Sequence, residues 1–418
     1  MAQNSPNIFR YGFAFLFPFW SAIASLKFFK SPSARNLFWY GCVFMGFIHI
    51  FNPIGGSQSD GVRYAEALVN IDTQRIDANV IKSYFYSQDG SLDIYQPLVT
   101  LFVSAFTKDP HFLFLIFAIV FGFFYSRNIW IVLNLSKKET LSWWVWIVLI
   151  MMLLVNPIWE INGVRMWTAL HVFVYGVLSF YINNDKKKLL WSFASIFIHF
   201  SFVFPLILIL IFQFLPKNKL TIFFVVYFIT AAFNEINLQS LNDSLTNILP
   251  AQLSSRTNSY LNEDYLMTVN ETNASYSQYL IIAKYLSKYF ILTMVVYFWI
   301  NKNSLFTNKF YQELLALFLF MSAAFQLVSV IPSMGRFFRV TDIIFYALLF
   351  LLLIDQHINN LEFNTFVKYL SLMLVLPILL TIRLGFEFYG TSLFWGNFVS
   401  AYFLDDRMPA IKYIKSMF

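Results

Sequence analysis

Charged residues are scarce in this sequence: they make up 12% of its 418 residues, whereas hydrophobic residues make up 58%. Soluble domains contain about 25% charged residues, and a domain of this length places them on its water-facing side. The scarcity of charge therefore excludes a soluble globular protein. It predicts a protein that crosses a membrane many times.

Cysteine is almost absent, since Cys42 is the only one. A single cysteine excludes an internal disulfide framework and a metal site built from cysteines. The sequence also lacks the phosphate-binding lysine loop of nucleotide hydrolases, the dinucleotide-binding glycine pattern, the GxSxG elbow and the HExxH motif. We therefore expect neither a metal ion nor another cofactor.

The formal net charge of +7 does not indicate a nucleic-acid partner. The lysines fall in short clusters between apolar runs, a distribution that is typical of proteins oriented in a membrane. The first apolar run ends at Lys27 and Lys30 without a small-residue cleavage site, so we expect a membrane anchor and not a cleaved leader.

Apolar runs of about the length that spans a bilayer, near 20 residues, predict an all-α polytopic transmembrane protein. Two runs are irregular: 93–107 is short enough for a re-entrant or interfacial helix, and 188–215 breaks near His199 and predicts a hairpin of two short arms. We expect about 12 transmembrane helices in a single transmembrane domain, residues 1–418. The regular runs are 9–28, 36–53, 110–133, 141–156, 164–183, 219–235, 276–300, 310–331, 337–355 and 365–384.

The lysine clusters orient this arrangement. All of them fall on one side only if 93–107 dips into the membrane and 188–215 folds back, and the positive-inside rule makes that side the cytoplasm. The long loops 54–92 and 236–275 then face outward, and residues 405–418 predict an amphipathic helix on the membrane surface. The clusters comprise Lys27, Lys30 and Arg35; Lys137 and Lys138; Lys186 to Lys188; Lys217 and Lys219; and Lys302 and Lys309.

Arginines at the starts of apolar helices are the first candidates for function. Arg165 begins the run 164–183, and an arginine close to the apolar zone usually has a partner or a task. It either supplies a positive charge to an anionic ligand or has a structural role, in which it reaches the lipid headgroups or pairs with Glu160. Arg336 and Arg339 lie three residues apart on one predicted helix face, where two guanidinium groups suit a diphosphate. Their structural alternative is a pair of Arg339 with Asp342.

Further polar residues lie at breaks and loop ends. His199 can act as a general base or bond the backbone groups freed by the break. Asp60 can contact a sugar hydroxyl, act as a base or cap a surface helix, and Tyr64 can provide a wall for a sugar ring. Arg63, Arg256 and Tyr95 complete the candidates for contacts to a glycan, although interfacial aromatic belts explain such tyrosines equally well.

The chain resembles the EpsG/Wzy-type exopolysaccharide and O-antigen polymerases of bacteria over roughly residues 9–384. The segment after the second run is similar to the family's outer segment through Gly56, Asp60 and Tyr64, although its leading arginine is missing and Arg63 stands inside the segment. The stretch that starts at Arg165 and runs through Ala169 is similar to the family's R-x-x-x-A segment. The order His199, Ser201, Pro205 resembles its H-x-S-x-x-x-x-P stretch, and Arg336 and Arg339 match a late arginine-bearing helix.

The resemblance implies a GT-C-like architecture and a glycosyltransferase that needs neither metal nor nucleotide. Its substrates would be oligosaccharides linked to undecaprenyl diphosphate in the bilayer of the bacterial inner membrane, with the active site facing the periplasm. Arg165, Arg336 and Arg339 would hold the diphosphate, and His199, Glu160 or Asp60 would be the base. A chain-length regulator is compatible with this reading as a further partner.

A flippase for lipid-linked oligosaccharides is the main alternative. It also needs arginines, but we would expect them through a central cavity and toward both leaflets, whereas the arginines here are predicted on one side. A scaffold of a secretion complex would not need arginines at the starts of helices.

Overall fold

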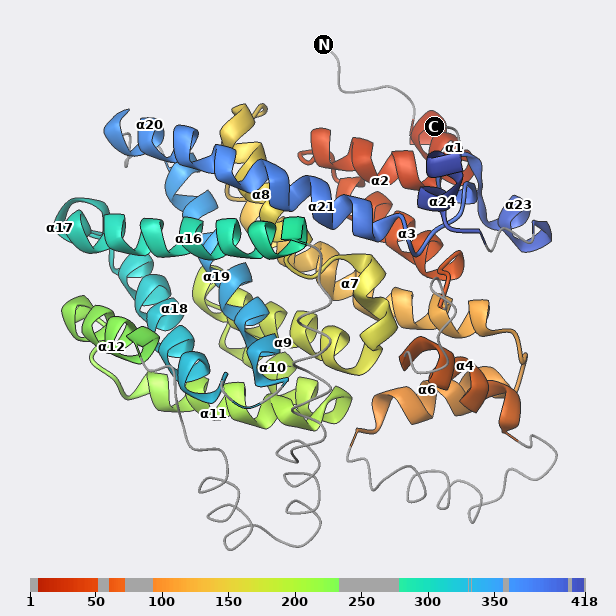
Figure 1. Ribbon diagram of the computed structural model, residues 1–418, viewed down its shortest axis with the longest axis horizontal. Helices are drawn as coiled ribbons and strands as arrows, with labels where there is room; N and C mark the ends of the chain where they lie inside the picture. Colours follow the sequence, from red (N-terminus) through yellow and green to blue (C-terminus); the bar gives the residue numbers. More distant parts are fainter. Residues whose placement is uncertain are drawn as a thin grey trace, which may run out of the picture. The chain divides into compact units, whose positions relative to one another are not determined.

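The computed structural model describes residues 7–51, 60–71, 93–232, 278–329, 331, 333–355, 361–404 and 408–416. Within these ranges every regular element is a helix and no strand occurs, which confirms the all-α prediction (Figure 1). Six helical segments are long and apolar enough to cross a membrane, and they indicate an integral membrane protein. They are Pro110–Leu133, Trp143–Ile182, Gln278–Ile300, Lys309–Val328, Met334–Ile354 and Leu361–Gly385.

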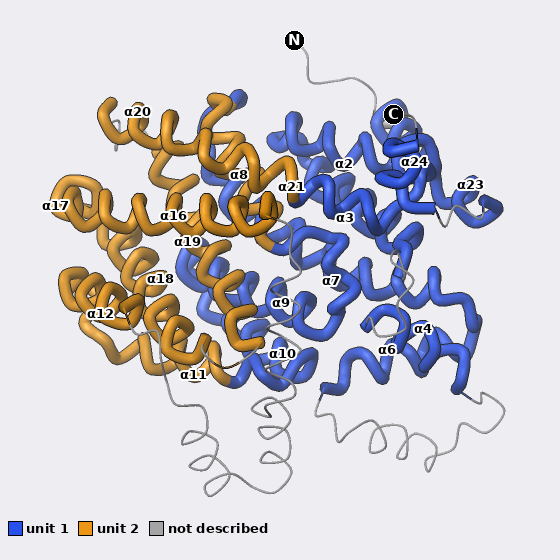
Figure 2. Tube along the Cα trace, viewed as in Figure 1, with its two compact units in different colours: residues 1–140, 156–203, 381–418 blue, residues 141–155, 204–380 orange. Residues whose placement is uncertain are grey.

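The chain forms two compact units, each built from segments that are distant in the sequence (Figure 2). Unit 1 comprises Met1–Thr140, Asn156–Val203 and Thr381–Phe418. Its helices are α1 (Asn7–Leu16), α2 (Pro18–Lys27), α3 (Ala34–Phe47), α4 (Asp60–Asn70), α6 (Tyr95–Ser104), α7 (Pro110–Leu133), η2 (Ile158–Gly163), α9 (Val164–Ile182), η3 (Lys186–Lys188), α10 (Leu189–Ile198), η4 (Phe200–Phe202), α22 (Ser392–Trp395), α23 (Phe398–Phe403) and α24 (Ala410–Ser416).

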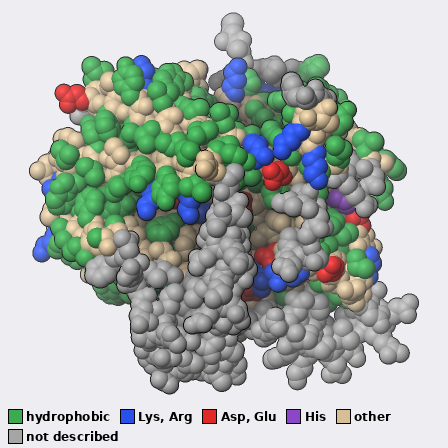
Figure 3. Space-filling model, in the orientation of Figure 1, with side chains coloured by type: hydrophobic (Ala, Val, Ile, Leu, Met, Phe, Trp, Pro, Cys, Tyr) green, Lys and Arg blue, Asp and Glu red, His purple; other side chains and the backbone are tan. Residues whose placement is uncertain are grey.

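Unit 2 comprises Leu141–Val155 and Phe204–Leu380. Large hydrophobic side chains are exposed on several of its helices, such as Ile229, Tyr285 and Ile300, as suits surfaces that face lipid (Figure 3). Its helices are α8 (Trp143–Leu154), most of α11 (Val203–Gln213), α12 (Leu220–Ala232), α16 (Gln278–Ile300), α17 (Lys302–Leu305), α18 (Lys309–Val328), η5 (Met334–Phe337), α19 (Phe338–Ile354), α20 (Leu361–Leu370), η7 (Ser371–Leu374) and the first part of α21 (Val375–Gly385).

Helices α3, α7 and α9 form the centre of unit 1. A small residue allows α3 and α7 to approach closely, since a Cβ at Gly46 would collide with the side chain of Ala118. Helices α7 and α9 run in the same direction, because Phe121 packs on His171 with ring centroids 4.6 Å apart and Phe124 packs on Tyr175 at 5.4 Å. Because α7 and α9 are parallel, their first residues lie at one end of unit 1 and their last residues at the other.

The first predicted span, residues 9–28, is not a single helix. It consists of α1 and α2, which are separated at Phe17, and Pro18 occupies the start of α2. Proline is favoured at the first turn of a helix because its missing N–H would have no partner there. The apolar run 9–28 therefore forms two short helices, because the proline starts a new helix.

The two irregular runs form a short helix and an interrupted one, as their lengths predict. The run 93–107 forms the short helix α6, and the run 188–215 is interrupted at His199, whose backbone is extended with φ −149° and ψ 114°. Helices α10 and α11 belong to different units, so the folding back of the two arms stays a prediction. The predicted C-terminal helix is present as α24; residues 405–407 and 417–418 lie outside the described residues.

Three of the lysine-bearing loops lie at the same end of unit 1, as predicted. The ammonium group of Lys30 donates to the carbonyl of Ser136, and the indole of Trp130 donates to the carbonyl of Phe29 at 3.2 Å. The start of α10 joins them through Trp191, whose ring lies 5.0 Å from that of Phe124. We call this the lysine end of unit 1.

Candidate functional site

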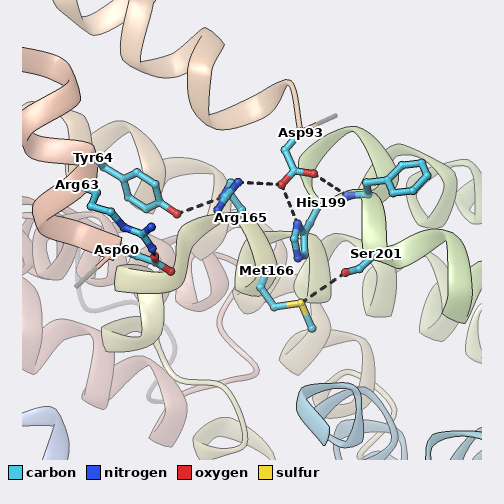
Figure 4. A network of polar contacts seen from close by, with 9 residues as sticks. Asp60, Arg63, Tyr64, Asp93, Arg165, Met166, His199 and Ser201 are labelled. Carbon is cyan, nitrogen blue, oxygen red and sulfur yellow. Dashed lines mark hydrogen bonds and ion pairs between the residues drawn. The ribbon is translucent and has the colours of Figure 1, made fainter. Parts of the chain in front are cut away.

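A network of polar side chains lies at the end of unit 1 that is opposite the lysine end. It joins Tyr64 on α4, Asp93 just before α6, Arg165 at the start of α9 and His199 at the break after α10 (Figure 4). These residues come from four segments that are far apart in the sequence. Only the packing of the helices brings them together.

Asp93 is the centre of this network. Its side chain is only 3% exposed, and one carboxylate oxygen, Oδ2, accepts from His199 Nδ1 at 2.8 Å and from an Arg165 guanidinium nitrogen at 3.2 Å. The other oxygen accepts from the backbone N–H of Phe200 at 2.8 Å. The N–H of Ile94 also donates to the carbonyl of Phe197 at 2.9 Å. Asp93 thus satisfies a backbone group that the helix break would otherwise leave without a partner.

The surroundings keep Asp93 ionised. Burial by itself would raise the pKa of the Asp93 carboxyl, but the hydrogen bond and charge of His199, the N–H of Phe200 and the charge of Arg165 outweigh it. The pKa of Asp93 is therefore lowered from its ordinary value. A buried carboxylate with these partners is a fixed negative charge at neutral pH.

The guanidinium group of Arg165 has two hydrogen-bond partners and further donors that are not used by them. Its Nε donates to the hydroxyl of Tyr64 at 3.3 Å, and one terminal nitrogen donates to Asp93. A guanidinium group has five N–H donors, so three remain for another ligand. The side chain is 32% exposed, which leaves these donors accessible. The structure gives Arg165 an ion-pair partner that its neighbours in sequence do not suggest, namely Asp93.

His199 presents one ring nitrogen to the network and the other away from it. An ionised carboxylate can only accept, so Nδ1 carries a proton toward Asp93 and Nε2 has a lone pair when the ring is neutral. The side chain is 26% exposed, and within the described residues Nε2 has no hydrogen-bond partner. A histidine oriented in this way by a carboxylate can accept a proton from a bound hydroxyl group.

The tyrosines expected to contact sugar have structural contacts here. Tyr64 is 6% exposed, and its ring packs against Phe117 while its hydroxyl bonds Arg165. Burial raises the pKa of Tyr64 to about 12, so its hydroxyl stays protonated. The ring of Tyr95 also packs against Phe117, with centroids 5.8 Å apart. In the structure Tyr64 therefore positions Arg165.

Asp60 and Arg63 lie beside the network and pair with each other. Asp60 starts α4, and its carboxylate forms an ion pair with Arg63, whose side chain is largely exposed. The charge of Asp60 still acts on Arg165. Helix α4 packs closely on η2 because a Cβ at Gly61 would collide with Asn162. Glu160, the third candidate base, lies half-buried in η2.

The remaining arginine candidates lie elsewhere in the chain. Arg336 is exposed in η5 of unit 2, and Arg339 is half-buried as the second residue of α19. The charge of Arg339 acts on Asp342, which agrees with the structural alternative for that arginine. Arg256 lies outside the described residues.

Asp93 was missed by the reasoning from sequence, which used it only as the boundary of a short apolar run. The signal was present, because a carboxylate directly before an apolar helix carries the same desolvation cost that singled out Arg165. What was not visible is that both belong to one site. Among the described residues, no group of three His, Cys, Asp or Glu side chains could hold a metal ion.

The sequence model of the EpsG family matches residues 37–389, which include every member of the network. The chain therefore belongs to the EpsG family, and this membership implies a role in exopolysaccharide biosynthesis. No curated protein and no solved structure matches the chain.

Proposed function

We propose, from membership of the EpsG family and from the network around Asp93, that the chain is a polysaccharide polymerase. It transfers a glycan from undecaprenyl diphosphate to the sugar end of a second lipid-linked repeat unit. The observation that carries the proposal is a histidine oriented by a buried carboxylate beside an arginine with accessible donors. Glycosyl transfer from a diphosphate needs both groups: a base for the acceptor and a cation for the leaving group.

His199 is the proposed base. Its Nε2 takes the proton of the acceptor hydroxyl as the oxygen forms a bond to the anomeric carbon of the donor sugar. The bond between that carbon and the diphosphate oxygen breaks, and the diphosphate leaves with the electron pair. The imidazolium formed at His199 is stabilised by Asp93, which already accepts from Nδ1 at 2.8 Å.

Arg165 is the proposed partner of the leaving diphosphate. Before the proton moves, the charges of Asp93 and Arg165 cancel, whereas afterwards the protonated His199 gives the network one excess positive charge. This charge appears as negative charge develops on the diphosphate, so the stabilisation is largest in the transition state. In unit 2, Arg336 and Arg339 remain candidates for binding phosphate because of their spacing at the start of a helix.

The proposed membrane orientation follows from α9. Its 19 residues rise about 28 Å. Arg165 lies at its first turn, and Lys186 to Lys188 follow its other end. If the lysine end faces the cytoplasm of a bacterium, the network faces the periplasm. The proposal retains about 12 crossings of the inner membrane in a GT-C-like arrangement.

The test is chain extension by the purified full-length protein. Lipid-linked repeat units supplied in detergent should be converted into longer glycans, which a gel resolves by length. His199→Gln should reduce extension about 10²- to 10⁴-fold, the range for loss of a general base. His111→Gln is the matched control: His111 bonds the carbonyl of Phe47 at 2.9 Å, outside the network.

The same assay separates the enzyme from its alternatives. If the protein were a flippase or a scaffold, the wild type would leave the glycan length unchanged. That result would contradict the proposed polymerase activity. If His199→Gln extends the glycan as fast as wild type, the polymerase activity still holds, but His199 is not the base. Glu160 and Asp60 would then be the next candidates, each tested by its amide variant.

A further inference from the structure

A second group of arginines lies at the lysine end of unit 1. Arg127 is on α7, ten residues after Phe117, which packs against Tyr64 of the network. At a rise of 1.5 Å per residue this places Arg127 about 15 Å from the network along the helix axis. Tyr175, which interacts with Arg127, lies ten residues after Arg165 on α9. Positions on α7 and α9 therefore both place Arg127 about 15 Å from the network along the helix axes.

Arg127 is only 9% exposed, and within the described residues it forms no ion pair with a carboxylate. Its guanidinium group lies over the ring of Phe123 at 3.8 Å and near the ring of Trp39 at 4.8 Å. It donates to the side chains of Ser126 at 2.8 Å and Asn36 at 3.1 Å. These contacts orient the group but leave its charge uncompensated.

Arg35 adds a second positive charge at the same place. It is the neighbour of Asn36 on α3, and its charge acts unfavourably on Arg127. Its Nε is buried and has no hydrogen-bond partner within the described residues. A buried N–H without an acceptor costs free energy, as do two like charges at short range. One anionic oxygen ligand would relieve both costs.

The neighbouring charges strengthen this preference. Lys188 lies over the ring of Tyr175 at 5.7 Å, and Lys30 is bound to the carbonyl of Ser136. The three clusters contain eight lysines and arginines, against which these loops place only two acidic residues, Asp185 and Glu139. The lysine end therefore carries a surplus of positive charge around Arg35 and Arg127.

We infer that Arg35 and Arg127 form a binding site for the phosphate of an anionic phospholipid in the leaflet at the lysine end. Paired guanidinium groups match phosphate geometry. Exposed apolar side chains that can contact acyl chains lie at the same end of the unit, namely Leu190, Trp191 and Phe193. This site does not depend on the proposed polymerase reaction, because it lies about 15 Å from the network along α7.

The test measures thermal unfolding of the purified full chain in detergent, with phosphatidylglycerol, phosphatidylcholine or inorganic phosphate added separately. We expect phosphatidylglycerol to raise the unfolding temperature of the wild type more than phosphatidylcholine does. Arg35→Gln should weaken the phosphatidylglycerol affinity about tenfold, the effect of losing one charged contact. Lys137→Gln is the matched control, since this exposed lysine carries the same charge at the same end.

Arg35→Lys keeps the charge but loses the planar fork and Nε. It should bind phosphatidylglycerol less tightly than wild type and more tightly than Arg35→Gln, and it provides a folded variant should Arg35→Gln fail to fold. If inorganic phosphate alone reproduces an Arg35-dependent rise, the ligand is a soluble phosphate and not a lipid. Equal responses of Arg35→Lys, Lys137→Gln and wild type, or no preference for phosphatidylglycerol, would overturn the site.

Discussion

Arg165 and Arg127 are both arginines in long apolar helices, yet their surroundings differ. Arg165 pairs with a buried carboxylate at 3.2 Å and keeps accessible donors. Arg127 lies between aromatic rings and amide or hydroxyl groups, with another arginine nearby and no carboxylate partner in the part of the chain that the structure describes. The first arrangement is neutral until a proton arrives, whereas the second is permanently positive.

This difference assigns different tasks to the two ends of unit 1. A neutral network that becomes positive on proton transfer is suited to a reaction in which negative charge develops. A permanently positive pair is suited to binding an anion that does not change. Substitutions that alter the charge or the contacts of the network around Asp93 test this difference, and the largest expected effect comes first.

Arg165→Gln removes the cation that pairs with Asp93 and leaves the network with an unpaired negative charge. We expect chain extension to fall about 10²- to 10³-fold, since a donor to the developing charge is lost. The measurement is the initial rate of glycan lengthening, normalised to the amount of protein in the membrane. Arg165→Lys, which keeps the charge but not the fork, should recover part of the rate. A protein that folds and extends normally without Arg165 would end its assignment to the diphosphate.

Asp93→Asn removes the carboxylate that distinguishes the two ends. We expect extension to fall about 10²-fold, because His199 loses the acceptor that fixes its ring orientation and stabilises its protonated form. The pH–rate profile separates this from general damage to the fold. Loss of the Asp93 carboxylate should change the shape of the profile, whereas damage to the fold would scale the whole profile equally.

Acid should weaken the network but not the Arg127 cluster. The pKa of Asp93 is lowered on folding, so its ionisation contributes stability that is fully present above the ordinary value of 3.8 and is lost as pH falls through the lowered value. Thermal unfolding of wild type and Asp93→Asn between about pH 6 and pH 3 measures this contribution. The difference between the two proteins should shrink toward the acid end. A difference that does not change with pH would contradict the role of the ionised carboxylate.

Tyr64→Phe should give the smallest effect. It removes the hydroxyl that accepts from Arg165 Nε at 3.3 Å but leaves the packing against Phe117 and the bond to Asp93. A hydrogen bond to a charged group contributes about 1.5–3 kcal/mol, and the long 3.3 Å bond lies at the low end, so extension should fall roughly tenfold. Tyr95→Phe is a matched control, because the Tyr95 hydroxyl has no partner within the described residues.

The sequence was sufficient for the two exposed members of the network. His199 was found because a polar residue interrupts an apolar run, and Arg165 because a charge stands at the start of one. Both signals are local, since they depend on the cost of polar groups near a bilayer core. The division of residues 9–28 into two helices was also readable from Pro18, but composition alone favoured one span.

Contacts between distant segments were not readable in this way. Glu160, five residues away, was the only partner that the spacing offered for Arg165, whereas the structure also places Asp93 against it, 72 residues away. Tyr64 was expected as a surface for sugar, yet its ring is buried. Local spacing restricts which residues share a helix face, but it does not specify which helices pack together.

The amino-acid sequence by itself determined that this protein is helical and apolar and that its lysines gather in loops, because hydropathy and charge act on each segment separately. The tertiary structure decided that Asp93, Arg165 and His199 form one network, and that the positive charge of Arg35 acts on Arg127. Electrostatic interactions depend on distances in space, and those distances arise only when the helices pack.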